Sequence, residues 1–338
     1  MNFASDNNAG THPTILEAIN NANEGYAHAY GDDPWREKAQ EICISMFGNN
    51  SNLFHVFGGT PANVLAIEPL LDKFGAILCS DEAHVFRDEA AAPERILGNK
   101  LYSVESENGK ITSHSLIETL SQFEDAHQPI PQVLTLTQTT ELGTVYTLDE
   151  LSAISETAKR NKLNIHLDGA RICNAAASLQ CSLNDIVKAS NADSISLGMT
   201  KNGGMFGENI VFFDEKYAHN FQFRRRNLMQ VQSKMRYIAA QFNAFFENDL
   251  WLTIAEHANS MAALLAEEIS GNKKIQIPIP AQTNAVFATV PSQLTEALLE
   301  QAYFYIFRPK ENMVRWMTSW QTTPEEVRDF AKIINENS

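Results

Sequence analysis

A lysine lies where a run of apolar residues breaks into a glycine-rich turn. The stretch SLGMTKNGGMFG, residues 196–207, places Lys201 after a strand-like segment and shortly before two adjacent glycines. Lysine is rarely buried without a partner, so this position presents an amine either to a ligand or to solvent. A solvated loop lysine is the commoner explanation of such a stretch taken alone. The residues that accompany it decide between the two.

An aspartate and a histidine follow two other apolar runs. Asp168 lies in HLDGAR, where burial of its carboxylate requires a cationic or hydrogen-bonded partner. Arg171 would be that partner in a structural ion pair, and the protonated ring nitrogen of a cofactor is the alternative. His84 lies just past the strand-like run AILCS and would place a flat ring beyond the end of that strand. A lone histidine is, however, more often structural than catalytic.

The stretch GGTPAN, residues 58–63, has the composition of an anion site. Its two glycines, Gly58 and Gly59, allow a close backbone approach. Thr60 is a favourable N-cap and Pro61 suits the first position of a helix, so the next amides would point at a phosphate. A plain strand-to-helix turn explains the motif equally well, because no G-x-G-x-x-G or P-loop spacing is present.

An anion site, an acid, a flat ring and a free amine together describe a pocket for an aromatic aldehyde that carries phosphate. Pyridoxal 5'-phosphate has this chemistry. Its aldehyde would form a Schiff base with Lys201, Asp168 would keep the pyridine nitrogen protonated, and His84 would stack on the ring.

The elements that position these residues alternate in type. From about residue 55, short apolar runs alternate with helical stretches, which predicts an α/β fold with a mostly parallel sheet covered on both faces. Ligands of such sheets bind beyond the carboxyl ends of the strands, where the candidate stretches fall. A capping box at Thr147 and Glu150, and Thr323 before Pro324, mark two helix starts.

The pattern of predicted helices and strands changes after residue 250. A long helical stretch is predicted over residues 216–246, and beyond Trp251 short strands mix with two or three helices. We therefore predict a large, cofactor-binding domain over residues 1–250 and a small α+β domain over residues 251–338.

Composition excludes several classes of partner. Acidic residues outnumber basic ones, 41 to 26 in 338 residues, and the net charge of -15 opposes binding to nucleic acid. No stretch reaches the ~20 apolar residues of a membrane span, and the N-terminus lacks the features of a leader, which predicts a cytoplasmic protein. No metal site or disulfide is predicted, because no C-x-x-C pair occurs among Cys43, Cys79, Cys173 and Cys181.

The chain resembles the threonine aldolases of the aspartate-aminotransferase-like (fold type I) pyridoxal-phosphate enzymes, a group that includes β-eliminating lyases and phenylserine aldolases. The matching stretches cover nearly the whole chain in family order, and LDGAR and the lysine turn are the most specific of them. They are SDNNAGTHP, YGDDP, GGTPAN, SDEAHVFRDEAAAPE, LDGAR, DSISLGMTKNGG and NMVRWMTSW.

The resemblance implies roles for eight residues. Lys201, His84 and Asp168 would be catalytic, as the Schiff-base lysine, the stacking residue and the partner of the ring nitrogen. The cofactor-binding residues would be Gly59 and Thr60 at the phosphate, with His84, Asp168, Arg171 and Lys201. The carboxylate of an amino-acid substrate would be held by Ser5, Arg171 and Arg315, since an arginine fork grips a planar carboxylate through two bonds. Enzymes of this kind are homodimers or homotetramers.

One stretch departs from the family pattern. Many L-threonine aldolases carry Asn-Thr-His-Asn after the strand that corresponds to QVLTLTQ, whereas this chain reads QTTELG over residues 138–143. The base that takes the β-hydroxyl proton is therefore open among His84, Glu141 and a bound water.

We interpret the chain as an enzyme that cleaves the Cα–Cβ bond of a β-hydroxy-α-amino acid of the threonine, allo-threonine or phenylserine type, giving glycine and an aldehyde. A β-eliminating lyase or aminotransferase on the same fold is the nearest alternative. A cofactor-binding regulator without turnover and a nucleotide-binding module that uses GGTPAN are alternatives from other classes. No DNA-binding segment accompanies the chain to support the regulator.

Overall fold

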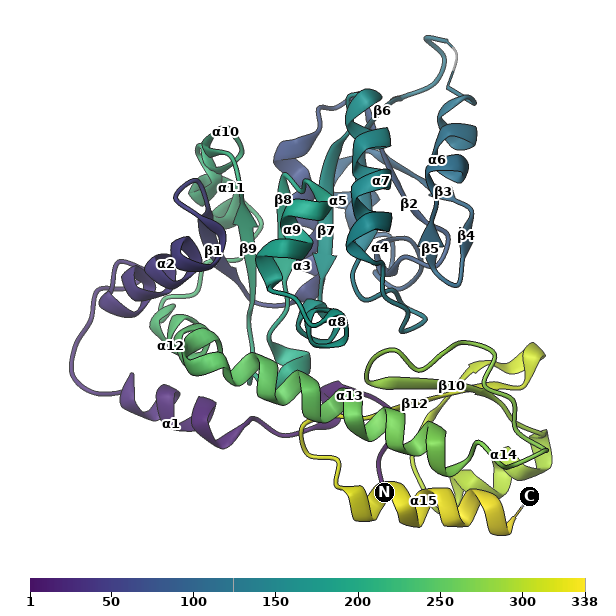
Figure 1. Ribbon diagram of the computed structural model, residues 1–338. Coiled ribbons are helices and arrows are strands. Elements are labelled where there is room, and N and C mark those ends of the chain that lie inside the picture. The colour runs from purple at the N-terminus through teal and green to yellow at the C-terminus, as the bar shows by residue number, and fades with distance from the viewer. Residues whose placement is uncertain (124, 338) are drawn as a thin grey trace.

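A seven-stranded sheet forms the centre of the computed structural model, which describes residues 1–123 and 125–337 (Figure 1). The strand order is β1-β9-β8-β7-β6-β2-β3, and the neighbours from β8 to β3 pair in parallel, while β9 runs antiparallel to β1 and β8. The strands are β1 (Asn52–Val56), β2 (Gly75–Ser80), β3 (Lys100–Val104), β6 (Ile130–Thr137), β7 (Asn164–Gly169), β8 (Ser194–Leu197) and β9 (Glu208–Phe212). The predicted α/β fold with a mostly parallel sheet is confirmed.

Helices cover both faces of this sheet. Along β2 the side chains of Ile77 and Cys79 join one apolar cluster and Leu78 joins another, so the strand is buried on both sides and needs a continuous apolar sequence. The helices of this unit are α1 (Pro13–Asn21), α2 (Pro34–Phe47), α3 (Gly59–Ile67), α4 (His84–Arg87), α5 (Ala92–Leu97), α6 (Ser113–Leu120), α7 (Leu148–Arg160), α8 (Ile172–Leu179), α9 (Leu183–Ser190), α10 (Glu215–Ala218), α11 (Phe221–Asn227) and α12 (Arg236–Phe246).

A second, smaller sheet has the antiparallel order β10-β12-β11 and packs against three helices. Its elements are α13 (Leu250–Glu268), β10 (Ala285–Thr289), α14 (Ser292–Leu299), β11 (Tyr305–Arg308), β12 (Met313–Met317) and α15 (Pro324–Glu336). The hairpin of β4 (Ser106–Glu107) and β5 (Lys110–Ile111) belongs to the large unit. No helix among the described residues is long and apolar enough to cross a membrane.

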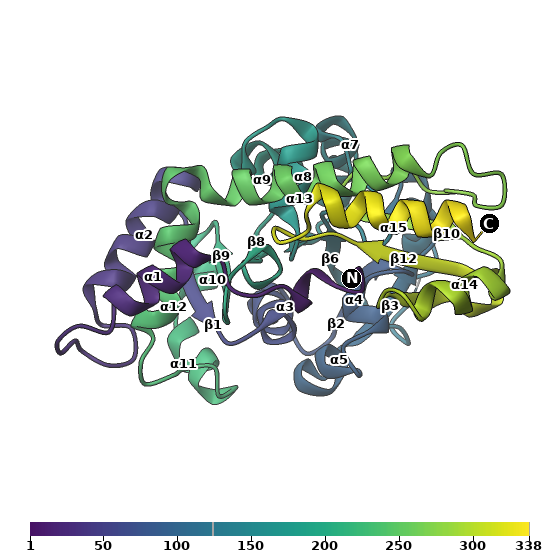
Figure 2. The same ribbon diagram turned by 90° about the horizontal axis from the view of Figure 1, so that it is seen from below.

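The helix α13 connects the two units. In Figures 1 and 2 it runs from the helices of the large sheet to the side of α15. Ile254 packs in the cluster of the large unit, while Leu265 packs in that of the small unit. Phe3 also joins the small unit, where its ring stacks on Phe330 at 4.6 Å between centroids. The division predicted at residue 250 stays a prediction, and the packing places the N-terminal residues with the small unit.

The helix starts at Thr147 and Thr323 are confirmed, because each forms a capping box with the glutamate three residues later. The helical stretch predicted over 216–246 is not continuous. Three helices, α10, α11 and α12, occupy this stretch. Asn220 and Met229 take positive φ values of 58° and 61° between and after the first two, a conformation that interrupts a right-handed helix.

Candidate active site

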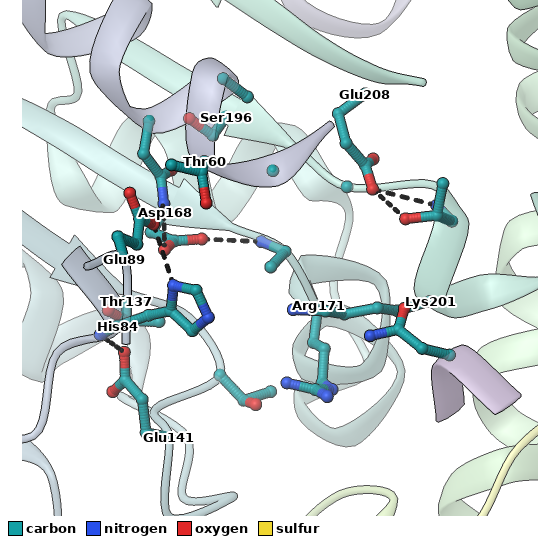
Figure 3. Close-up of a pocket in the computed structure, with 18 residues that line it drawn as sticks. Thr60, His84, Glu89, Thr137, Glu141, Asp168, Arg171, Ser196, Lys201 and Glu208 are labelled. Atoms are coloured by element: carbon teal, nitrogen blue, oxygen red, sulfur yellow. Dashed lines mark hydrogen bonds and ion pairs between the residues drawn. The ribbon is translucent and has the colours of Figure 1, made fainter. Parts of the chain in front are cut away.

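A cavity of about 250 Å³ lies at the carboxyl ends of β6, β7 and β8, and the start of α3 also lines it (Figure 3). Six of the eight residues predicted for the site line it together: Gly59, Thr60, His84, Asp168, Arg171 and Lys201. Ser5 and Arg315 do not. No group of three or more histidine, cysteine, aspartate or glutamate side chains suited to a metal ion occurs among residues 1–123 and 125–337.

Lys201 lies in a short 3₁₀ helix, η3 (Thr200–Asn202), directly after β8. Burial lowers the pKa of its ammonium group, and the positive charge of Arg171 lowers it further. The carboxylate of Glu208 holds this turn by accepting the backbone N–H of Met199 at 2.5 Å and the hydroxyl of Thr200. A lysine in such a place is more readily uncharged, and therefore nucleophilic, than one in solvent.

Asp168 lies at the end of β7 with its carboxylate facing the cavity. Its Oδ2 accepts a hydrogen bond from Asn63 Nδ2 at 3.0 Å, and its Oδ1 accepts the N–H of Ala170 at 3.1 Å. The ion pair with Arg171 that the sequence left open is not formed. Arg171 instead binds Asp6, so the Asp168 carboxylate is available to a cationic ligand.

Arg171 and Asp6 form a buried, two-bonded ion pair. Nε and Nη2 of Arg171 donate to the two carboxylate oxygens at 2.6 and 2.8 Å, and Asn284 Nδ2 donates to Oδ2 at 3.1 Å. Burial alone would raise the pKa of Asp6, but the charge and hydrogen bonds of Arg171 outweigh it and lower that pKa. Sequence reasoning missed Asp6, although it lies within the quoted stretch SDNNAGTHP.

His84 begins α4 and is oriented by a buried glutamate. Its Nδ1 lies 2.9 Å from Oε1 of Glu89, whose side chain is fully buried, and this contact raises the pKa of His84. Asn63 Nδ2 donates both to Glu89 at 2.8 Å and to Asp168. The Asn63 amide thus links the Glu89–His84 pair to Asp168. Sequence reasoning did not name Asn63 as a site residue. The signal that could have found it is its position one helical turn after Thr60.

The anion-site stretch folds differently from the prediction. Helix α3 begins at Gly59 with Gly58 as its N-cap, and no side chain caps it, so the prediction of Thr60 as N-cap and Pro61 as first helical residue is wrong. The reason is that Gly58 takes extended dihedral angles and Gly59 is already helical. A Cβ added at either glycine would meet nothing within 4 Å. The space beside these two glycines is therefore open, and no side chain caps the first amides of α3.

The other two predicted residues lie at the junction of the two units. Ser5 caps the 3₁₀ helix η1 (Asp6–Asn8), where its hydroxyl accepts the N–H of Asn7 at 3.2 Å. Arg315 lies on β12, and its Nη2 donates to the carbonyl of Ala4 at 3.3 Å. Its Nε is buried and has no hydrogen-bond partner among the described residues. Burial and the charge of Arg171 lower the pKa of Arg315, so the two guanidinium groups act on each other.

Comparisons with known proteins agree with this architecture. The family model described as beta-eliminating lyase matches residues 2–293. The chain is 40% identical over 334 residues to a low specificity L-threonine aldolase of Pseudomonas aeruginosa, covering 98% of this chain and 96% of that protein. A similar enzyme of Pseudomonas sp. is 39% identical over 331 residues, 97% of this chain and 95% of its own.

A solved structure of a threonine aldolase from Leishmania major superposes with a TM-score of 0.94 at 27% identity, covering 99% of this chain and 98% of that one. The fold and the lysine-bearing cavity define an α/β lyase of the beta-eliminating lyase class. Within that class, the chain belongs to the threonine aldolase family.

Proposed function

We propose that this chain is a pyridoxal-phosphate-dependent lyase that cleaves a β-hydroxy-α-amino acid of the threonine type to glycine and an aldehyde. The observation that carries the proposal is the meeting of Lys201, Asp168 and His84 around one cavity. The relatives named as low specificity L-threonine aldolases support the reaction class.

The residues present fit the cofactor. The unfilled space outside Gly58 and Gly59, at the free amides of α3, suits a phosphate. Asp168 has a carboxylate that is not neutralised by an arginine, which suits a protonated ring nitrogen. The cofactor supplies an electron sink for the bond that breaks at Cα.

The chain's own residues would then divide the work. Lys201 would bond the cofactor aldehyde with its amine, and His84, held by Glu89, would cover one face of the ring. Gly59 and Thr60 would hold the phosphate. The substrate carboxylate would be held by Arg171 and Arg315, with Ser5 nearby on the N-terminal segment.

The relatives' aldehyde-releasing reaction and a β-elimination give different products. Purified enzyme loaded with pyridoxal phosphate is incubated with L-threonine, L-allo-threonine and phenylserine. We expect acetaldehyde or benzaldehyde and glycine in equal amounts. Release of 2-oxobutyrate and ammonia from threonine would support the β-eliminating alternative instead, and accumulation of pyridoxamine phosphate would support an aminotransferase.

We also propose that the chain works as a homodimer or homotetramer in the cytoplasm. Large apolar side chains are exposed at Tyr26, Phe223 and Met229. The Arg226 guanidinium lies 4.9 Å from the Tyr30 ring, so the segment 26–30 is a neighbour of the segment 223–229. Exposed apolar groups that gather on one surface are typical of contacts between subunits. Light scattering after size exclusion measures the mass, and a monomer of 37.7 kDa would exclude this assembly.

A further inference from the structure

We propose that Glu141 takes the proton of the substrate's β-hydroxyl during cleavage, through its Oε2 atom. This inference rests on the proposed function, since it assigns a base for that reaction. It resolves the choice among His84, Glu141 and water in favour of the carboxylate.

Glu141 is held in the cavity by one oxygen and is free at the other. It lies in the loop that follows β6, and its Oε1 accepts the backbone N–H of His84 at 2.8 Å. Its Oε2 is buried and has no hydrogen-bond partner among the described residues. Glu141 lines the cavity on the side of His84 (Figure 3), so a substrate group that reaches Oε2 would supply the donor that this buried oxygen lacks. A buried acceptor without a donor is costly unless a ligand satisfies it.

The other acids of the cavity are engaged at one or both carboxylate oxygens, and His84 is engaged at Nδ1. Both oxygens of Asp168 accept hydrogen bonds, from Asn63 and Ala170. Oε1 of Glu89 contacts both Asn63 and His84, while its Oε2 is also buried without a hydrogen-bond partner among the described residues. Because Glu89 holds His84, we assign it a positioning role. The same contact raises the pKa of His84, so a larger share of its imidazole already carries a proton at a given pH and cannot accept another.

The surroundings of Glu141 set its proton affinity in the range a base requires. Burial and, after it, the negative charge of Asp168 on β7 together raise the pKa of Glu141 to about 7, against the neighbouring His84 N–H and Thr137 hydroxyl, which lower it. The other charged or titratable groups that interact with Glu141 are Arg171 next to α8, Cys79 on β2 and Tyr146 in the loop before α7. A carboxylate with a pKa near neutrality accepts a proton in the transition state and releases it afterwards.

The step balances in atoms and electrons. The β-hydroxyl O–H bond breaks as the carbonyl C=O bond of the aldehyde forms, and the proton passes to Oε2 of Glu141. The Cα–Cβ bond breaks and its electron pair remains with Cα. Glu141 then releases its proton to water, and Cα takes one proton from water, which yields glycine.

Two substitutions separate a base from a positioning residue. Glu141→Gln keeps an oxygen that accepts the His84 N–H but places an amide, which takes up no proton, at the free position. Glu141→Ala removes both functions. If Glu141 is the base, both variants of the loaded enzyme lose roughly 100-fold or more in kcat/KM for L-threonine cleavage. The rise of wild-type kcat/KM with pH near neutrality should disappear in Glu141→Gln. Glu300→Gln, at an exposed position after α14, is the matched control and should behave as wild type.

Two measurements test the site without any transfer of the β-hydroxyl proton, because glycine has no β-hydroxyl. Equilibrium binding of glycine, followed by the visible absorption of the bound cofactor, should change by no more than about twofold in Glu141→Gln. Exchange of the glycine α-proton with D₂O should also persist. Loss of both would show that Glu141 only shapes the cavity, and near wild-type cleavage by Glu141→Gln with loss in Glu141→Ala would show that it only positions His84. If wild-type enzyme releases no aldehyde, the proposed function itself fails.

Discussion

Two groups of charged and polar residues form the site, and they are assembled in different ways. The strand-end group, namely His84, Glu141, Asp168 and Lys201, follows β2, β6, β7 and β8 of one sheet. The junction group, namely Asp6, Arg171, Asn284 and Arg315, comes from the N-terminal segment, the large unit and the small unit. Register between neighbouring parallel strands fixes the first group, whereas contacts between remote segments fix the second.

The difference separates chemistry from substrate capture. The strand-end group lies within one layered unit and keeps its geometry as long as that sheet is folded. The junction group requires both units to be docked, because Asp6 joins Arg171 of the large unit to Asn284 of the small unit. We therefore expect substitutions in the first group to abolish reaction steps, and substitutions in the second to change stability and substrate affinity.

Lys201→Ala tests the strand-end group with the largest expected effect. Without the amine, no covalent bond to the cofactor aldehyde forms, and cleavage should fall by roughly 10³-fold or more. The visible absorption of the lysine-bound cofactor should also be absent. Borohydride reduction followed by peptide mass analysis locates the adduct, and an adduct on another lysine in this variant would refute the assignment.

Arg171→Ala tests whether the junction group holds the two units together. Removing the guanidinium leaves the carboxylate of Asp6, which is 1% exposed, without its cation, and breaking such a pair destabilises a protein by about 3–5 kcal/mol. Urea unfolding at pH 7 measures the loss. Arg160→Ala, which breaks an exposed pair with Glu156, should change stability by less than about 1 kcal/mol.

The direction of the pKa shift of Asp6 predicts how the stabilisation by the Asp6–Arg171 pair depends on pH. The folded pKa of Asp6 lies below the ordinary value of 3.8, so the pair's stabilisation is present above that value and is lost as the pH falls through the folded pKa. The stability difference between wild type and Arg171→Ala should therefore narrow in acid. A difference that stays constant down to pH 3 would show that Arg171 acts through packing alone.

Arg315→Ala tests substrate binding while leaving both partners of the buried Asp6–Arg171 ion pair in place. Loss of one side of a partly desolvated carboxylate contact typically amounts to about 2–5 kcal/mol, so kcat/KM should fall by roughly 30-fold or more, mainly through KM. The cofactor spectrum should be unchanged, since Arg315 does not line the cavity. Arg328→Ala, an exposed arginine on α15, is the control. An unchanged KM would remove Arg315 from the substrate site.

The same contrast explains what the sequence could predict. Lys201 and Asp168 follow apolar runs, and the carboxyl ends of parallel strands share one edge, so local pattern sufficed to bring them together. Asp6 could not be paired with Arg171 from local pattern, because 165 residues separate them and no periodicity relates an N-terminal turn to α8. The breaks in the helical stretch predicted over 216–246 were missed for a related reason. Composition does not show that Asn220 adopts a left-handed conformation, which interrupts the helix there.

The stability of Glu141→Gln, compared with wild type at two pH values, should show the smallest change, and it contrasts the two groups most directly. In wild type the folded pKa of Glu141 is about 7, above the ordinary value of 4.5. The folded state therefore binds more protons between these two values, and its stability falls as the pH rises through them. Glutamine does not titrate. The variant should therefore match wild type near pH 5 and be more stable by about 1–3 kcal/mol at pH 8, measured by urea unfolding without added cofactor. Equal stabilities at both pH values would mean that the Glu141 carboxyl titrates as it does in solvent. A stabilised variant that no longer cleaves substrate would show that the strand-end group retains an unfavourable charge for its chemistry, whereas the Asp6–Arg171 pair of the junction group is neutralised within the protein.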